Sequence, residues 1–266
     1  DSFNLLLVFF RNNLILGMEV ITLLKVLLIS ICFCQLLNSF DSDHAIEKGI
    51  FSTAYAFIGY VVFYVWNLSW MDGVLLLPLM VLGLKKLLYE RKKALYIIVI
   101  ALAILSNFYI GYMLCLASGL SYIAYCLYID SSDTLSLQRI KTTLPAYLIS
   151  SFWGVAISMG LFLPTYLALP QNRKQNLREM LHSLKLNFSF TDFISTFYTA
   201  SVLPKDSPDN LPLTFIGIIP FILLIAFFLN RKIKWKEKLL SMLLIAVFIL
   251  SFEISFFNII WHGFSV

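Results

Sequence analysis

Long apolar runs separated by short polar or basic stretches are the dominant pattern of this 266-residue chain. A helix of roughly 20 apolar residues crosses the hydrocarbon core of a bilayer, which is about 30 Å thick. We expect eight such helices, at about residues 14–37, 50–65, 73–88, 94–106, 110–127, 144–167, 213–229 and 239–259. The runs lack the alternation of apolar and polar residues that a membrane β-barrel requires. The pattern therefore predicts an all-α polytopic membrane protein whose residues 1–266 form one transmembrane domain, with residues 168–212 as an external loop.

The apolar stretch over residues 94–128 is too long for one crossing. At 1.5 Å per residue it would extend about 50 Å as a helix, against a core of about 30 Å. The polar group Ser106-Asn107 lies in its middle. We therefore expect a helix break there.

Composition and charge support a membrane protein and suggest its orientation. The chain is 60% hydrophobic and only 13% charged, whereas a soluble protein needs more charged surface. Basic residues mark the cytoplasmic side of membrane proteins, and here three loops on one side of the expected topology carry them: Lys85, Lys86, Arg91, Lys92 and Lys93; Arg139 and Lys141; Arg231, Lys232, Lys234, Lys236 and Lys238. This anchoring explains the net charge of +5 without any nucleic-acid partner. The opposite, external side then receives Asp72, Asn107, the 168–212 segment and His262.

The four cysteines give no sign of a metal site. All lie within expected helices, where a thiol behaves as a small hydrophobe, and Cys32 and Cys34 lack the second ligand pair that a zinc site needs. The chain begins without methionine and stops directly after an apolar run. We expect it to be an internal piece of a larger protein.

Asp72 is a lone carboxylate between two apolar segments, at an expected membrane surface. One interpretation is a solvated loop acid that caps the next helix, since helix N-termini favour carboxylates. The other is a catalytic or metal-ligating carboxylate, beside Trp70 in the interfacial aromatic belt. Spacing alone does not choose between them.

Lys25 lies near the middle of the first expected span, too deep for its ammonium to reach either interface. Such a charge needs a partner in the protein interior or in a water-filled cavity. Glu19 is about 120° around the same helix, so we expect a residue on another span, such as Glu253, or a lipid phosphate. A purely structural ion pair is the equal alternative.

Two further segments are candidates for substrate contact. The break at Ser106–Tyr112 is either a tight helical turn with interfacial tyrosines or a polar pocket lined by Asn107 and Tyr109. In the external segment, apolar residues recur at helical spacing, at Leu177, Met180, Leu181 and Leu184. This spacing predicts a surface helix that packs on the membrane or bundle, or else serves as a lid.

Several strings resemble the bacterial YfhO family of membrane proteins over essentially the whole chain. They are Trp70-Met-Asp72-Gly-Val-Leu-Leu-Leu-Pro78, Ser106-Asn-Phe-Tyr-Ile-Gly-Tyr112, Leu163-Pro-Thr165 and Asn258-Ile-Ile-Trp-His-Gly-Phe264. Lys25 also matches a lysine of that family. The resemblance implies a GT-C-like glycosyltransferase in the bacterial plasma membrane. It would move a sugar from a polyprenyl-phosphate donor to an external cell-envelope polymer such as lipoteichoic acid.

The resemblance also implies roles for particular residues. Asp72 matches the family's Trp-x-Asp position and is our candidate catalytic carboxylate, to orient the acceptor or to hold a divalent cation. Lys25 would offset charge on the leaving phosphate, and we expect substrate contacts at Trp70, Asn107, Tyr109 and His262. The family's earlier Gly-Asp motif, which carries the main catalytic acid, and its later Pro-Asn-Trp-Phe-Pro-Tyr-Arg segment are absent, so this piece alone should be inactive.

Two other classes remain open. A transporter or flippase of the lipid-linked sugar would also use an intramembrane lysine and broken helices, but would form no glycosidic bond. A scaffold for another transferase would tolerate loss of both Asp72 and Lys25. External placement of Asp72 and Asn107 favours the transferase, and the lack of a visible inverted repeat counts against transport.

Overall fold

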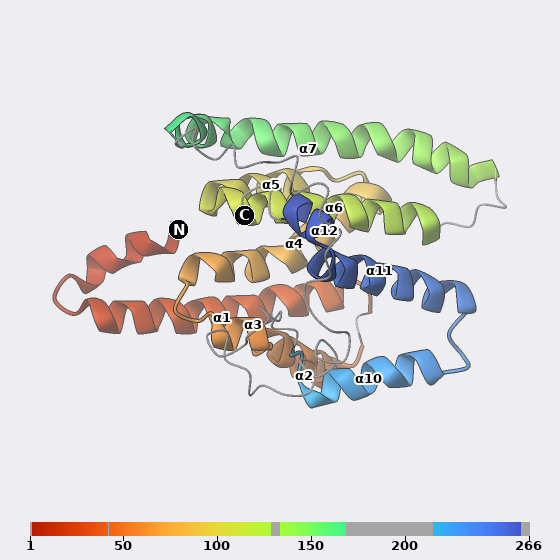
Figure 1. Ribbon diagram of the computed structural model, residues 1–266, viewed down its shortest axis with the longest axis horizontal. Coiled ribbons are helices and arrows are strands. Elements are labelled where there is room, and N and C mark those ends of the chain that lie inside the picture. The colour runs from red at the N-terminus through yellow and green to blue at the C-terminus, as the bar shows by residue number, and fades with distance from the viewer. Residues whose placement is uncertain (1, 42, 129–133, 169–214, 262–266) are drawn as a thin grey trace. The chain divides into compact units, whose positions relative to one another are not determined.

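All regular structure in the described part of the chain is helical (Figure 1). The computed structural model describes residues 2–41, 43–128, 134–168 and 215–261. Its helices are η1 (Ser2–Phe10), α1 (Leu14–Asn38), α2 (Ala45–Ala56), α3 (Gly59–Phe63), α4 (Leu68–Glu90), α5 (Ala94–Ser106), α6 (Phe108–Tyr128), α7 (Thr134–Ala168), α10 (Ile218–Leu229), α11 (Trp235–Glu253) and α12 (Ser255–Trp261). The expected all-α class is thus confirmed for these residues. The predicted surface helix of the 168–212 segment lies outside them.

The chain divides into two compact units. Unit 1 is formed by Asp1–Ser118 and Leu137–Leu167, and unit 2 by Gly119–Ser136 and Ala168–Val266. Helices α1–α5 therefore belong to unit 1 and α10–α12 to unit 2, while α6 and α7 contribute to both.

Two described helices, α1 and α6, are long and apolar enough to cross a bilayer by themselves. Helices α5 and α10 are apolar but shorter. Other expected spans are interrupted. Over residues 50–65 the chain forms α2 and α3, because Ile58 is extended (ψ 153°) ahead of Gly59, a weak helix former. Ile254, also extended, separates α11 from α12. The eight-span topology stays a prediction.

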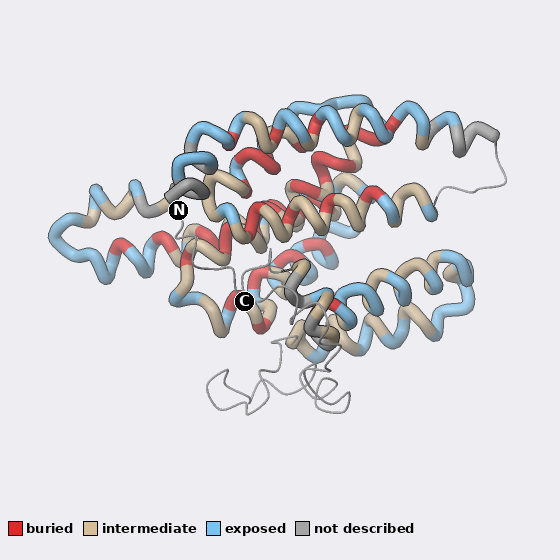
Figure 2. The backbone as a smooth tube through the Cα atoms, turned by 45° about the horizontal axis from the view of Figure 1, so that its top comes forward, coloured by how far each residue is buried: buried red, intermediate tan, exposed pale blue. Residues whose placement is uncertain are grey.

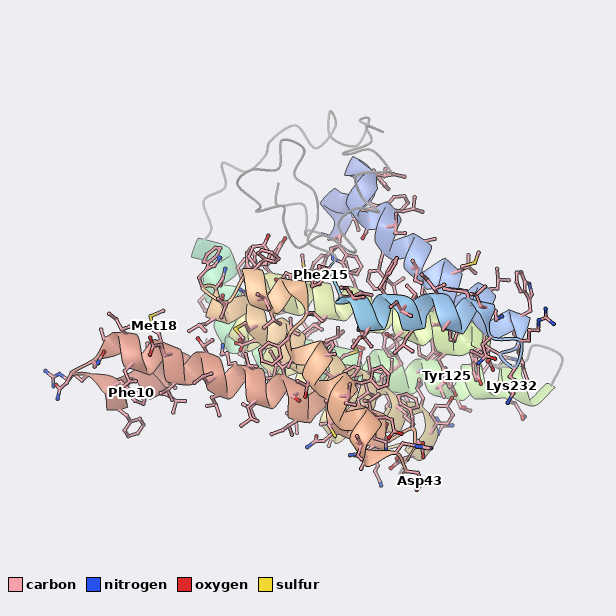
Figure 3. The ribbon with its side chains drawn as sticks, turned by 90° about the horizontal axis from the view of Figure 1, so that it is seen from below. Phe10, Met18, Asp43, Tyr125, Phe215 and Lys232 are labelled. Atoms are coloured by element: carbon pink, nitrogen blue, oxygen red, sulfur yellow. The ribbon has the colours of Figure 1, made fainter. Side chains whose placement is uncertain are left out.

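Helix α1 is anchored at its start and buries one narrow stripe. The Asn13 side chain caps it by accepting a hydrogen bond from the Leu16 backbone N–H at 3.1 Å. Its buried residues recur every three or four positions, at Gly17, Ile21, Lys25, Ile29, Cys32 and Leu36. Figure 3 shows Met18 near the start of α1, close to Phe10 of η1, and Asp43 beyond its other end. This stripe faces the neighbouring helices, which places Lys25 in the packed interior.

Helix α4 packs between α1 and α5, and its closest approach to α5 depends on glycine. A Cβ atom at Gly83 would come within 2.8 Å of the Tyr96 Cα atom. At the far end of α4, the Lys85 ammonium donates to the Ser39 carbonyl and lies 4.0 Å from the centre of the Phe40 ring. A cation there complements the negative end of the α1 dipole. The C-terminal ends of α1 and α4 therefore lie together.

A proline inside α4 frees a carbonyl that another helix satisfies. Pro78 has no N–H, so the Val74 carbonyl four residues earlier lacks its usual helical donor. The Tyr55 hydroxyl of α2 donates to that carbonyl at 2.9 Å. Phe33 of α1 stacks on the Tyr55 ring with 4.3 Å between ring centres and holds it in place.

Tyr55→Phe is expected to lower the unfolding free energy by about 1 kcal/mol, since it removes one partly buried hydrogen bond but keeps the ring. In a Pro78→Ala background the loss should nearly vanish, because alanine at that position supplies the missing backbone N–H to the Val74 carbonyl. Thermal unfolding of the four proteins of this cycle in detergent checks the prediction. Equal losses in both backgrounds would contradict the link between Tyr55 and Pro78.

A network of hydroxyl groups ties α5, α6 and α7 together in unit 1. The fully buried Tyr96 hydroxyl lies 3.0 Å from the Ser118 Oγ atom and 2.9 Å from the Ser151 Oγ atom. Ser118 in turn lies 3.1 Å from the Tyr147 hydroxyl. In a membrane, apolar side chains pack against lipid tails as readily as against another helix. Hydrogen bonds between helices therefore help to hold them together.

In unit 2, α11 contacts α10 near its N-terminal end and α12 near its C-terminal end. The Lys238 ammonium donates to the Phe228 carbonyl at the end of α10, at 2.7 Å. The rings of Phe248 and Trp261 meet edge to face, with 5.6 Å between centres, where α11 packs on α12.

Large apolar side chains cover much of the outer surface of both units. Figure 2 shows the turn between η1 and α1 in pale blue, and α10 has no buried residue. The exposed apolar residues of α10 are Ile218, Ile219, Ile222, Leu223, Ile225 and Leu229. Soluble proteins rarely expose such surfaces, whereas lipid tails accept them.

Candidate functional site

A buried ion pair between Lys25 and Asp72 joins α1 to α4. The Lys25 Nζ atom lies 2.6 Å from the Asp72 Oδ1 atom, and the two side chains are 0% and 6% exposed. We expected the partner of Lys25 on another span, such as Glu253, or at a lipid phosphate. A partner on another helix is confirmed, and it is Asp72, which the sequence analysis treated as a separate feature.

Further contacts surround this pair. The Lys25 ammonium donates to the Leu68 carbonyl at 2.7 Å and lies 4.9 Å from the centre of the Phe3 ring. The Ser106 hydroxyl donates to the Asp72 Oδ2 atom. Both carboxylate oxygens of Asp72 are therefore engaged, one by α1 and one by the last residue of α5.

Asp72 is inside a helix, so its interpretation as a loop acid or helix cap is wrong. Helix α4 begins at Leu68, five residues earlier than the expected span, and Asn67 occupies the cap position. Asp72 thus lies in the second turn, on the side of α4 that faces α1 and α5. The sequence pattern missed this start because Asn67 and Ser69 are polar and interrupt the apolar run. In the structure the Ser69 hydroxyl donates to the Asn67 Oδ1 atom at 2.8 Å, and the backbone is already helical at Leu68.

The pair lies near helix ends, although Lys25 is halfway along α1. Leu68 is the first residue of α4 and Ser106 is the last residue of α5. Lys25 contacts the first and Asp72 the second, so the buried charges lie at the level where α4 begins and α5 ends. The contribution of Ser106 was not foreseen, but its place next to the predicted break was a signal.

The surroundings of Asp72 do not fit a divalent cation. The described residues contain no group of three or more His, Cys, Asp or Glu side chains that could hold a metal ion. The ammonium 2.6 Å from Asp72 would also repel a second cation. We therefore assign no metal step to these residues.

The expected break between α5 and α6 occurs at Asn107. Its backbone is extended (ψ 114°), and its Oδ1 atom accepts hydrogen bonds from the backbone N–H groups of Tyr109 at 3.0 Å and Ile110 at 3.3 Å. Asn107 is thus the cap of α6. Gly111 lets the two helices meet, since a Cβ atom there would lie 2.6 Å from the Ile104 Cα atom. A role of Asn107 or Tyr109 in substrate contact stays a prediction.

Trp70 belongs to a cluster of four aromatic rings at the start of α4. Its ring centre lies 6.4 Å from Tyr60, 5.1 Å from Tyr64 and 6.4 Å from Trp66. We call these four residues the aromatic patch. The patch, the Asp72 pair and the Asn107 break all lie at the same end of α4. His262 lies outside the described residues.

A family model and a curated relative match this chain. A family model described as "Bacterial membrane protein YfhO" matches residues 1–266. A curated relative from Bacillus subtilis (strain 168), named "Uncharacterized protein YfhO", is 26% identical over 194 residues. That alignment covers 73% of this chain and 20% of the relative, so the chain spans about a fifth of the relative's length. No solved structure matches the chain.

Proposed function

Because the chain belongs to the YfhO family of bacterial membrane proteins, we propose that it forms part of a membrane glycosyltransferase. The enzyme would take a sugar from a polyprenyl-phosphate donor and attach it to a cell-envelope polymer, such as lipoteichoic acid. The reaction would occur on the outer face of the plasma membrane, with a GT-C-like arrangement of helices.

The observation that carries this proposal is the buried pair of Lys25 and Asp72 beside a helix break. Ionisable side chains within membrane segments are expensive and usually mark substrate or ion paths. Here the pair lies where α4 begins and α5 ends, and the proposal requires that the donor phosphate reach this level.

The chemistry would be a single inverting displacement at the anomeric carbon of the sugar. The acceptor hydroxyl forms the new bond to that carbon, and the bond to the phosphate oxygen breaks, so polyprenyl phosphate leaves with the electron pair. A carboxylate takes the hydroxyl proton, and the main base is expected elsewhere in the protein. Lys25 would offset the negative charge that grows on the leaving phosphate.

In this arrangement the donor phosphate competes with Asp72 for the Lys25 ammonium. Once the phosphate takes the ammonium, Asp72 loses its closest positive charge and becomes free to accept a hydrogen bond from the acceptor. Asp72 would then orient the acceptor hydroxyl, with Ser106 holding its other oxygen.

Asp72→Asn is expected to lower sugar transfer by about 100-fold, the size of the loss when a reacting group is misplaced by about 1 Å. The intact protein and this variant are compared at equal membrane abundance in a strain lacking the gene, and envelope-polymer glycosylation is read by NMR. Asp41→Asn, an exposed carboxylate of unit 1, is the control and should leave transfer unchanged. Full glycosylation with Asn at position 72 would remove Asp72 from the transfer site.

The same experiment separates the alternatives. If sugar transfer is lost and the donor accumulates on the outer face, the protein is a transferase. Donor accumulating on the inner face would indicate a flippase, which a buried charge pair in a membrane helix would also suit. Transfer that persists without both Asp72 and Lys25 would indicate a scaffold for another enzyme.

A further inference from the structure

The aromatic patch consists of four contacting rings that come from three consecutive segments of the chain. Tyr60 comes from α3, Tyr64 and Trp66 from the turn that follows, and Trp70 from the first turn of α4. Trp70 contacts the other three rings, and its plane is within 18° of the Tyr60 plane. The rings therefore support one another as a unit.

One indole of the patch is free to meet a ligand. Trp66 is 68% exposed, and the rings of Tyr64 and Trp70 contact it, with ring centres 6.2 and 6.4 Å away. Aromatic residues of an interfacial belt usually anchor the protein at the membrane surface. A braced ring loses little freedom when a second flat surface stacks on it, which is the condition for productive stacking.

The polar groups around the patch restrict what that second surface can be. Tyr60 and Tyr64 carry hydroxyl groups, and the Asn67 and Ser69 side chains, which bond to each other at 2.8 Å, lie in the same stretch of sequence. A ligand for such a site needs a flat apolar face ringed by hydroxyl groups. A pyranose ring has this form, with C–H groups on its face and hydroxyls around its edge.

The position of the patch links it to the buried pair. Leu68, whose carbonyl accepts a hydrogen bond from Lys25, lies between Trp66 and Trp70 in the chain. A ligand with its phosphate at Lys25 would carry its attached sugar to this end of α4. We propose that the aromatic patch binds the sugar of a polyprenyl-phosphate sugar by stacking on Trp66. This inference rests on the proposed function and deepens it.

The test measures binding rather than transfer. The intact protein in lipid nanodiscs is titrated with farnesyl phosphate bearing glucose or N-acetylglucosamine, and with farnesyl phosphate alone. At least one sugar-bearing probe should bind more tightly than the sugar-free lipid. Trp66→Ala should weaken that probe about twofold to tenfold and leave the sugar-free lipid unchanged.

Two control variants keep the test specific. Trp66→Phe retains a ring and should keep most of the preference for sugar. Trp153→Ala removes another exposed tryptophan of unit 1, 53% exposed on α7, and should change nothing. Equal binding of all three probes, or a sugar preference that survives Trp66→Ala, overturns the inference and leaves the patch as a lipid anchor. A protein that prefers the sugar-bearing probe but transfers no sugar supports the inference while overturning the transferase.

Discussion

Lys25→Met alone is expected to destabilise the protein by about 3–5 kcal/mol, whereas Lys25→Met combined with Asp72→Leu should restore most of that loss. The single change leaves the Asp72 carboxylate buried at 6% exposure without its counter-charge, and an unpaired buried charge is strongly unfavourable. The double change replaces both ions with apolar groups of similar volume, which is often neutral. Thermal unfolding of the three proteins in detergent measures the difference.

The comparison also separates structure from function. Lys93→Met, an exposed lysine in the same unit, is the control and should stay within about 0.5 kcal/mol of the native protein. If the pair is only a link between α1 and α4, the double variant should fold and transfer sugar normally. The proposed function requires that it fold and fail. Undiminished transfer by Lys25→Met would remove the role of Lys25 at the leaving phosphate.

Gly111→Ala is expected to be the most damaging single-methyl change near the site, lowering stability by about 1–3 kcal/mol or more. The added Cβ atom would lie 2.6 Å from the Cα atom and 2.8 Å from the N atom of Ile104. Backbone atoms cannot swing aside as a side chain can, so α5 and α6 must separate. Because Ser106 ends α5, its hydrogen bond to Asp72 should weaken as well.

Gly160→Ala provides the matched control for this prediction. Gly160 is exposed on α7, and a Cβ atom there would meet nothing within 4 Å. Alanine should be neutral there, or stabilising by about 0.5–1 kcal/mol, because glycine is a poor helix former. Unfolding temperatures of both variants decide the matter. A Gly111→Ala protein as stable as Gly160→Ala would contradict the close approach of α5 and α6.

Local sequence patterns predict the helical class, the extent of α1 and the break at Asn107. These features depend on local properties: the length of an apolar run, the period of its buried residues, and a capping side chain next to a helix that would otherwise be too long. The sequence also indicates that Lys25 needs a partner, since a charge within an apolar helix cannot stay alone.

The identity of that partner depends on tertiary packing. Lys25 and Asp72 are 47 positions apart in the chain, and Asp72 and Ser106 are 34 apart. Their meeting depends on how α1, α4 and α5 rotate and cross, and no local period encodes this. The same holds for the Tyr55 hydroxyl at the carbonyl freed by Pro78, and for the rings that brace Trp66. Local sequence predicts that a buried charge or carbonyl needs an ion-pair or hydrogen-bond partner, while helix packing determines which residue supplies it.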